Sequence, residues 1–164
     1  MPLDAAFHPD GSFSVLCDGA VLFFDRDGNQ LRRYALTGMT LVGADMRDGY
    51  VALIGAENAL GSENRVLVLN ASGEELLSQM YRERMQQVCL TRKEEGDPLC
   101  AVLTAAAVMS MDENGICAIC LLEDDDVLTL RQAAGGMMVC TKDCMYPAVF
   151  TDTEKNAEMT GGLT

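Results

Sequence analysis

The chain has 164 residues with 12 basic and 25 acidic side chains, which gives a formal net charge of −13. This excess of carboxylates argues against nucleic acids and anionic membrane surfaces as partners, because both are bound mainly through Lys and Arg. With 49 % hydrophobic and 23 % charged residues, the chain has the composition of a protein that folds around a core of its own.

Short apolar segments separated by turn residues run along the chain and predict β-strands. The nearly apolar run at 99–111 is too short for the roughly 20 residues of a membrane-spanning helix. The first residues lack the basic and apolar segments of a signal peptide, so none is expected. In chain order, the predicted strands cover residues 13–17, 21–24, 31–36, 50–55, 66–69, 99–103, 108–111 and 116–122.

One strand–turn–strand pattern recurs. Three copies have their turn glycines at Gly28, Gly73 and Gly115, which lie 45 and 42 residues apart. In each copy an Asp or Asn ends the first strand; such a side chain hydrogen-bonds the turn backbone, and Gly supplies the positive φ. A degenerate fourth copy at 149–156 has Lys155 in the place of the glycine. The period is therefore about 42 residues.

The period and its strand content predict the fold class. About four short strands fall within each period, which is the content of one propeller blade. We therefore expect an all-β fold, a propeller-like array of about four four-stranded antiparallel repeats in a single domain. The expected domain is 1–164, with approximate repeats at 5–40, 41–85, 86–127 and 128–164.

The segment 73–89 also supports an alternative. Ser72-Gly73-Glu74-Glu75 has the pattern of a capping box, and apolar residues recur after it at helical spacing. A helix here would make the fold α+β. The alignment with Gly28 instead predicts a turn and a strand.

Two segments resemble β-propeller repeat proteins. Residues 5–13, which include His8-Pro9-Asp10-Gly11, resemble the turn that opens a WD40-like blade, and residues 24–34 resemble the strand–turn–strand of quinoprotein-like blades. The chain has no Trp, and Arg32 stands where a tryptophan-docking motif would place one. The resemblance implies a propeller fold and implies no activity.

The sequence offers no catalytic constellation. His8, the only histidine, lies in a predicted turn without a nearby nucleophile, whereas histidine-based catalysis needs both an orienting and a reacting partner. The acidic segments 25–29 and 123–126 invite a calcium site, but they lack the ligand spacing of an EF-hand loop. A hairpin turn and a solvated loop are the preferred interpretations.

Sulfur-containing side chains supply the remaining metal candidates. Cys117 and Cys120 have CxxC spacing, but a strand would point them to opposite faces, where they would serve as structural residues. Cys140, Cys144 and Met145 are soft ligands that could hold Cu(I), although no distant ligand completes the set. We therefore expect no metal and no cofactor. The seven cysteines cannot all pair within one chain, which favours a reducing compartment such as the cytoplasm.

These observations favour a non-enzymatic, propeller-like binding or scaffolding module with an acidic surface and another protein as its partner. A second hypothesis makes the chain a fragment of a larger propeller enzyme or extracytoplasmic sensor whose active site lies elsewhere. A small metal-binding protein is a third, tested by elemental analysis.

Overall fold

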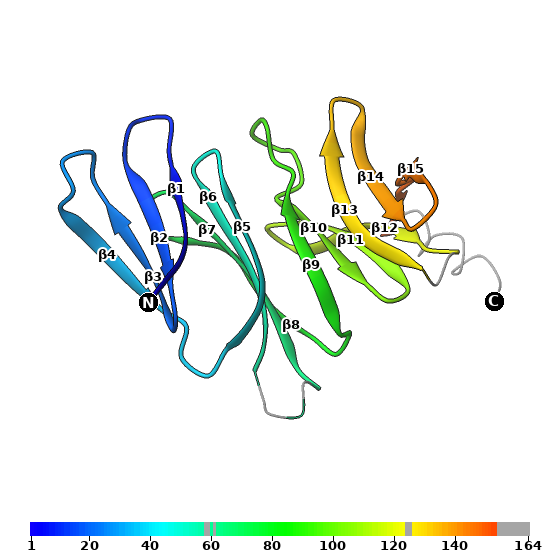
Figure 1. Ribbon diagram of the computed structural model, residues 1–164, viewed down its shortest axis with the longest axis horizontal. Coiled ribbons are helices and arrows are strands. Elements are labelled where there is room, and N and C mark those ends of the chain that lie inside the picture. Colours follow the sequence, from blue (N-terminus) through cyan, green and yellow to red (C-terminus); the bar gives the residue numbers. More distant parts are fainter. Residues whose placement is uncertain (58–59, 61, 124–125, 154–164) are drawn as a thin grey trace. The chain divides into compact units, whose positions relative to one another are not determined.

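The computed structural model describes residues 1–57, 60, 62–123 and 126–153, and every element assigned within them is a β-strand (Figure 1). The strands form four antiparallel sheets, so the prediction of an all-β, propeller-like array is confirmed. The α+β alternative is wrong, because the segment 73–89 contains a turn and strands instead of a helix. The chain divides into two compact units, Met1–Glu83 and Arg84–Thr164.

The first unit consists of two four-stranded sheets in which each strand pairs with the next one along the chain. In Figure 1 the first sheet is blue, and the second runs from cyan to green. The first sheet contains β1 (Pro2–Phe7), β2 (Phe13–Cys17), β3 (Ala20–Phe24) and β4 (Gln30–Ala35), and the second contains β5 (Thr40–Arg47), β6 (Tyr50–Ala56), β7 (Asn64–Asn70) and β8 (Glu75–Tyr81).

The core of this unit lies between its two sheets. Leu16, Val21 and Phe23 from the first sheet are at most 1 % exposed and pack against buried side chains of β6 and β7. Each such side chain stabilises the fold by about 1.5–3 kcal/mol relative to an exposed one. Tyr34 on β4 donates a hydrogen bond to Glu75 on β8, and burial together with this bond raises the pKa of Tyr34 to about 12.

Two turns of the first unit share one hydrogen-bond pattern. The Asp25 carboxylate accepts from the backbone N–H groups of Asp27 and Asn29 at 2.9 and 2.8 Å. The Asn70 side chain accepts equivalently from Ser72 and Glu74, both at 3.0 Å. The turn glycines Gly28 and Gly73 have φ values of 86° and 77°, and Gly115 in the second unit has φ 115°. A left-handed glycine thus ends each turn.

The same geometry explains why no helix forms after Gly73. A helix would need negative φ at this position, and its capping residue would bond the first helical N–H groups; here Asn70 already engages them in a turn. Along β8 the side chains then alternate, with Leu77 buried at 2 % exposure and Ser78 exposed. Burial of one face of β8 in the core therefore outweighs the helical spacing of the apolar residues, and the segment forms a strand.

The second unit contains the third and fourth sheets. Their core lies between them and includes Leu103 and Val108 from the third sheet with Leu130 and Val139 from the fourth. The third sheet has the order β16-β12-β11-β10-β9 and the fourth β13-β14-β15. The strands are β9 (Met85–Leu90), β10 (Cys100–Thr104), β11 (Ala107–Asp112), β12 (Gly115–Leu121), β13 (Val127–Ala133), β14 (Gly136–Thr141), β15 (Met145–Pro147) and β16 (Thr151–Asp152).

One side chain links these two sheets through the backbone of β13. The Gln87 Oε1 atom on β9 accepts from the Leu130 N–H and from the Thr129 hydroxyl, both at 2.8 Å. The Gln87 Nε2 atom donates to the Leu130 carbonyl at 3.1 Å. The amide therefore pairs with a strand edge as a neighbouring peptide group would.

The fourth copy of the repeat differs from its sequence expectation. Thr151 and Asp152 pair with Ile119 and Ala118 of β12, so this segment extends the third sheet. Lys155, the expected counterpart of the turn glycines, lies outside the described residues.

Candidate interaction surface

The first sheet has a second apolar face. Because side chains alternate along a strand, the neighbours of the core residues Leu16, Val21 and Phe23 point away from the second sheet. Strand pairing places these neighbours in rows across β1, β2 and β3. We call them the outer face, defined by Ala5, Phe7, Phe13, Val15, Leu22 and Phe24.

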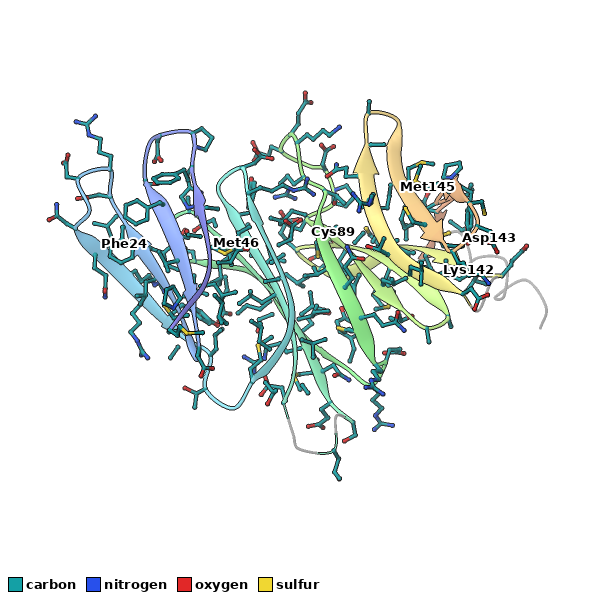
Figure 2. The ribbon with its side chains drawn as sticks, in the orientation of Figure 1. Phe24, Met46, Cys89, Lys142, Asp143 and Met145 are labelled. Carbon is teal, nitrogen blue, oxygen red and sulfur yellow. The ribbon has the colours of Figure 1, made fainter. Side chains whose placement is uncertain are left out.

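Three phenylalanines form one row of the outer face. The Phe13 ring stacks on Phe24 with centroids 4.8 Å apart and an interplanar angle of 8°, and Phe7 lies 5.5 Å from Phe13. Phe7 is 77 % exposed, and Phe13 and Phe24 are half-buried (Phe24 is labelled in Figure 2). The rings thus hold one another in place and still present apolar surface to solvent.

The strands of this sheet have an unusual pattern for a solvated surface. An antiparallel sheet with one wet face alternates apolar and polar residues. β2 reads Phe-Ser-Val-Leu-Cys and β3 reads Ala-Val-Leu-Phe-Phe, with little alternation. Polar side chains appear only further along these rows, at Gln30 and Arg33 of β4. Such strands are typical of sheets that are covered on both faces.

A polar hollow of about 510 Å³ lies at the turns of the first unit. Asp25 and Asp10 line it, and hydrogen bonds from their own turns hold the pKa of each carboxyl below its usual range. In Asp25 the donors are Asn29 and the turn backbone. The segment 25–29 therefore forms a hairpin turn, with Asp25 engaged in shaping it.

His8 and Ser14 form a buried pair. The His8 Nε2 and Ser14 Oγ atoms are 2.6 Å apart, and the two residues are 5 % and 0 % exposed. Burial lowers the pKa of His8, although the nearby Asp10 carboxylate opposes this shift. A substrate cannot reach the buried Ser14 hydroxyl. The hydrogen bond instead links His8, in the β1–β2 turn, to Ser14 on β2.

The sulfur candidates lie on the fourth sheet but do not converge as one exposed cluster. Cys140 is 7 % exposed, whereas Met145, opposite it in the β14–β15 pairing, is 64 % exposed. Cys144 lies in the connecting turn, where its N–H donates to the Thr141 hydroxyl at 3.1 Å; Lys142 and Asp143 of the same turn are labelled in Figure 2. Among the described residues, no group of three or more His, Cys, Asp or Glu side chains could hold a metal ion.

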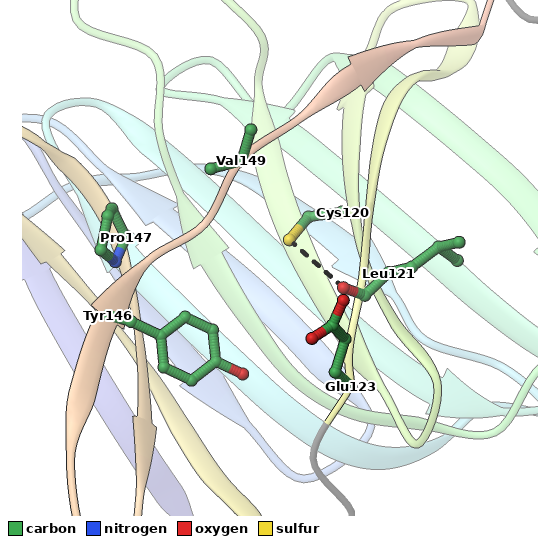
Figure 3. A pocket seen from close by; sticks show the side chains of 6 residues that line it. All are labelled: Cys120, Leu121, Glu123, Tyr146, Pro147 and Val149. Carbon is green, nitrogen blue, oxygen red and sulfur yellow. Dashed lines mark hydrogen bonds between the residues drawn. The ribbon is translucent and has the colours of Figure 1, made fainter.

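The CxxC cysteines have separate surroundings in β12. Cys117 contacts the Ser110 carbonyl at 3.3 Å, while Cys120 belongs to the core of the second unit. A hollow of about 350 Å³ beside Cys120 is walled mainly by apolar groups, and Glu123 is the carboxylate among its described lining residues (Figure 3). The acidic run 123–126 lies only partly within the described residues.

Over the described part of the chain, no helix is long and apolar enough to span a membrane. The outer face of the first sheet, which no other part of the first unit covers, is the feature that most needs a functional explanation, because folded proteins seldom leave several neighbouring large apolar side chains in solvent. Residue-by-residue sequence reasoning missed it. The available signal was the apolar run 20–24 together with 13–17, in which Ser14 is the one polar residue.

No known protein family and no curated protein matches the chain. Solved structures do. The chain superposes on a Bacteroides caccae protein of unknown function (TM-score 0.54, 19 % identity), on the computationally designed Ika4 protein (0.57, 16 %) and on a eukaryotic initiation factor (0.52, 17 %). These alignments cover 93–94 % of this chain but 58 %, 89 % and 44 % of those chains, respectively. At such identities the likeness shows the fold, and the chain is an all-β protein of propeller-like sheets.

Proposed function

We propose that this chain is a non-enzymatic binding or scaffolding module whose interaction surface is the outer face of the first sheet. The single observation that carries the proposal is the row of Phe7, Phe13 and Phe24 on a face that nothing in the unit covers. Aromatic side chains bring large apolar area to an interface with few rotatable bonds, so they are enriched at binding surfaces.

The net charge of the molecule supports a specific interaction surface and argues against non-specific association. A net charge of −13 keeps copies of the chain soluble, and an apolar patch on such a background is a localised exception. Arg33 and Gln30 border the patch and would supply the polar rim of an interface. The partner is expected to present an apolar centre with hydrogen-bond acceptors at its margin.

A second candidate has its own support. The chain spans 58 % of the Bacteroides caccae protein and 44 % of the initiation factor. Under this proposal the chain is a portion of a larger propeller enzyme or sensor, and the outer face packs against a sheet from the rest of that protein. Any activity would then lie outside this sequence.

Site-specific photo-cross-linking tests the binding proposal. A photoreactive phenylalanine analogue in place of Phe7 should give discrete covalent adducts, because this ring lies in the proposed interface. The matched control is the same analogue in place of Leu121, which is also 77 % exposed but lies on β12. Equal adduct yields at the two positions would contradict the proposal, as would repeatable turnover in a broad hydrolase and oxidoreductase screen.

A further inference from the structure

We infer that the second unit holds a binding site for a small zwitterion with an apolar side chain, of the size and charge of a free aliphatic amino acid. The site is a hollow of about 340 Å³ between the third and fourth sheets. All of its lining residues belong to Arg84–Thr164, so it is distinct from the outer face of the first sheet. Its volume lies at the lower end of the range of ligand pockets, which suits a small molecule.

The hollow forms where small side chains replace large ones between the two sheets. On the third sheet, Ala101 and Ser110 lie directly opposite each other and are 1 % and 7 % exposed. Two residues along the same strands, Leu103 and Val108 fill the core. Because packed sheets keep a spacing of about 10 Å, the two small side chains leave space that Met137 on β14 lines from the fourth sheet.

The walls of the hollow are largely apolar and would bury an aliphatic side chain. Met137 is 7 % exposed, and Ala148 and Phe150 pack against the core of the second unit. Pro98 and Pro147 add two further apolar surfaces. An aliphatic group of a ligand would therefore leave water on entering this space, which favours binding.

The rim carries one positive and one negative side chain that do not neutralise each other. Lys93 and Asp97 both line the hollow, and in the described part of the chain neither has an ion-pair partner. The Gln132 amide on β13 lines it too and makes no side-chain hydrogen bond to another described residue. A zwitterion would bind Lys93 and Gln132 through its carboxylate and Asp97 through its ammonium group. A ligand with a single charge would leave one of the two rim charges unpaired.

The loop that carries both charges is held in place by its own hydrogen bonds. The Asp97 Oδ2 atom accepts from the backbone N–H groups of Lys93 and Glu94 at 3.3 and 3.0 Å. The Arg92 guanidinium donates twice to the Asp97 carbonyl, at 2.9 and 2.7 Å. These contacts leave the Asp97 Oδ1 atom for an ammonium group, and little ordering of the loop backbone is needed when a ligand binds.

Isothermal titration calorimetry of the purified full chain at neutral pH tests the site, with L-leucine as the probe. One L-leucine should bind per chain, with a dissociation constant below about 1 mM. Two analogues each lack one charge: 4-methylpentanoate has no ammonium group, and 3-methylbutylamine has no carboxylate. Each should bind at least about tenfold more weakly than L-leucine.

Two lysine variants show whether the probe occupies this hollow. Lys93→Gln should weaken L-leucine binding at least about tenfold and leave the weak binding of 3-methylbutylamine unchanged, because that analogue has no carboxylate to bind Lys93. Lys142→Gln is the matched control, since it removes the same charge from the β14–β15 turn, away from the hollow. Both lysines are exposed, so both variants should melt near the unmodified protein.

Four outcomes would overturn the inference: no saturable binding of L-leucine up to about 10 mM, equal affinity for L-leucine and 4-methylpentanoate, unchanged L-leucine binding in Lys93→Gln, or an equal loss in Lys142→Gln. None of these results bears on the outer face of the first sheet. Failure of the amino-acid site and failure of the proposed function are therefore distinguishable.

Discussion

Replacing Gly73 with alanine tests the packing of the first unit at one atom. A Cβ at this position would lie 2.8 Å from the Cε2 atom of Phe23 and 2.9 Å from the Cδ atom of Arg32. Phe23 is 1 % exposed and fixed in the core between the two sheets, so its ring has little room to move. The β7–β8 turn of the second sheet therefore packs directly on the Phe23 ring of the first sheet, and an alanine Cβ would have to displace that ring.

The expected cost has two parts. Alanine in the left-handed region costs about 1 kcal/mol at a turn with φ 77°. Overpacking against Phe23 adds about 1–3 kcal/mol. Gly28 separates the two parts, because its turn has the same hydrogen bonds and φ 86°, yet a Cβ there would meet nothing within 4 Å. Gly28→Ala should therefore cost only about 1 kcal/mol.

Urea unfolding at 25 °C, followed by circular dichroism, measures both variants. We expect Gly73→Ala to lose about 1–3 kcal/mol more than Gly28→Ala, which corresponds to a melting temperature lower by about 2–12 °C in a chain of 164 residues. Equal losses would refute the contact with Phe23. A stabilised Gly73→Ala variant would refute the turn itself, because alanine stabilises only where φ is negative.

Because burial lowers the pKa of His8 below its usual 6.5, the unfolded chain takes up the proton first, and unfolding free energy should fall as pH drops from 7.5 to 5.5; His8→Gln should remove this slope. Gln87→Leu should cost about 2–4 kcal/mol in urea unfolding, because it strips hydrogen bonds from Leu130, whereas exposed Gln86→Leu should change little. Cys144, the exposed cysteine among the seven, should react with a thiol reagent before all others in the folded protein.

Each of these has a clear contrary result. If the unfolding free energy of His8→Gln keeps the same pH slope, groups other than His8 cause it. Asp10 is not one of them, because its carboxylate stays ionised in this pH range. Equal losses in the two glutamine variants would show that the amide does not hold β13. Modification of Cys100 or Cys120 as fast as that of Cys144 would show that the burial of these two side chains is not maintained in solution.

Much of the fold follows from local chemistry that the sequence displays. Asp25 with Gly28 and Asn70 with Gly73 predict the two turns, because an acceptor side chain followed by a left-handed glycine leaves few other conformations. Strand positions follow too: residues 13–17 are predicted as a strand and form β2. The helical spacing after Gly73 misleads, because Leu76 and Met80 match a helix face and yet remain partly or largely exposed on β8.

The arrangement of chain segments in sheets is harder to predict. Thr151 and Asp152 join the edge of β12 through backbone hydrogen bonds, and backbone pairing leaves no trace in side-chain identity. The outer face depends on a similar question. An apolar run such as 20–24 indicates that both faces of the strand are buried against other surfaces, but it does not show which surfaces these are.

The glutamine that links β9 to β13 has a consequence for solubility. β13 is an edge strand, and edge strands offer unpaired N–H and C=O groups on which foreign strands can grow into aggregates. At Leu130 both groups are already bound to the Gln87 amide, so an incoming strand would have to displace that side chain before it could pair in register. The Gln87 amide thus blocks the edge of β13, so that a strand from another molecule cannot extend the three-stranded sheet on this side.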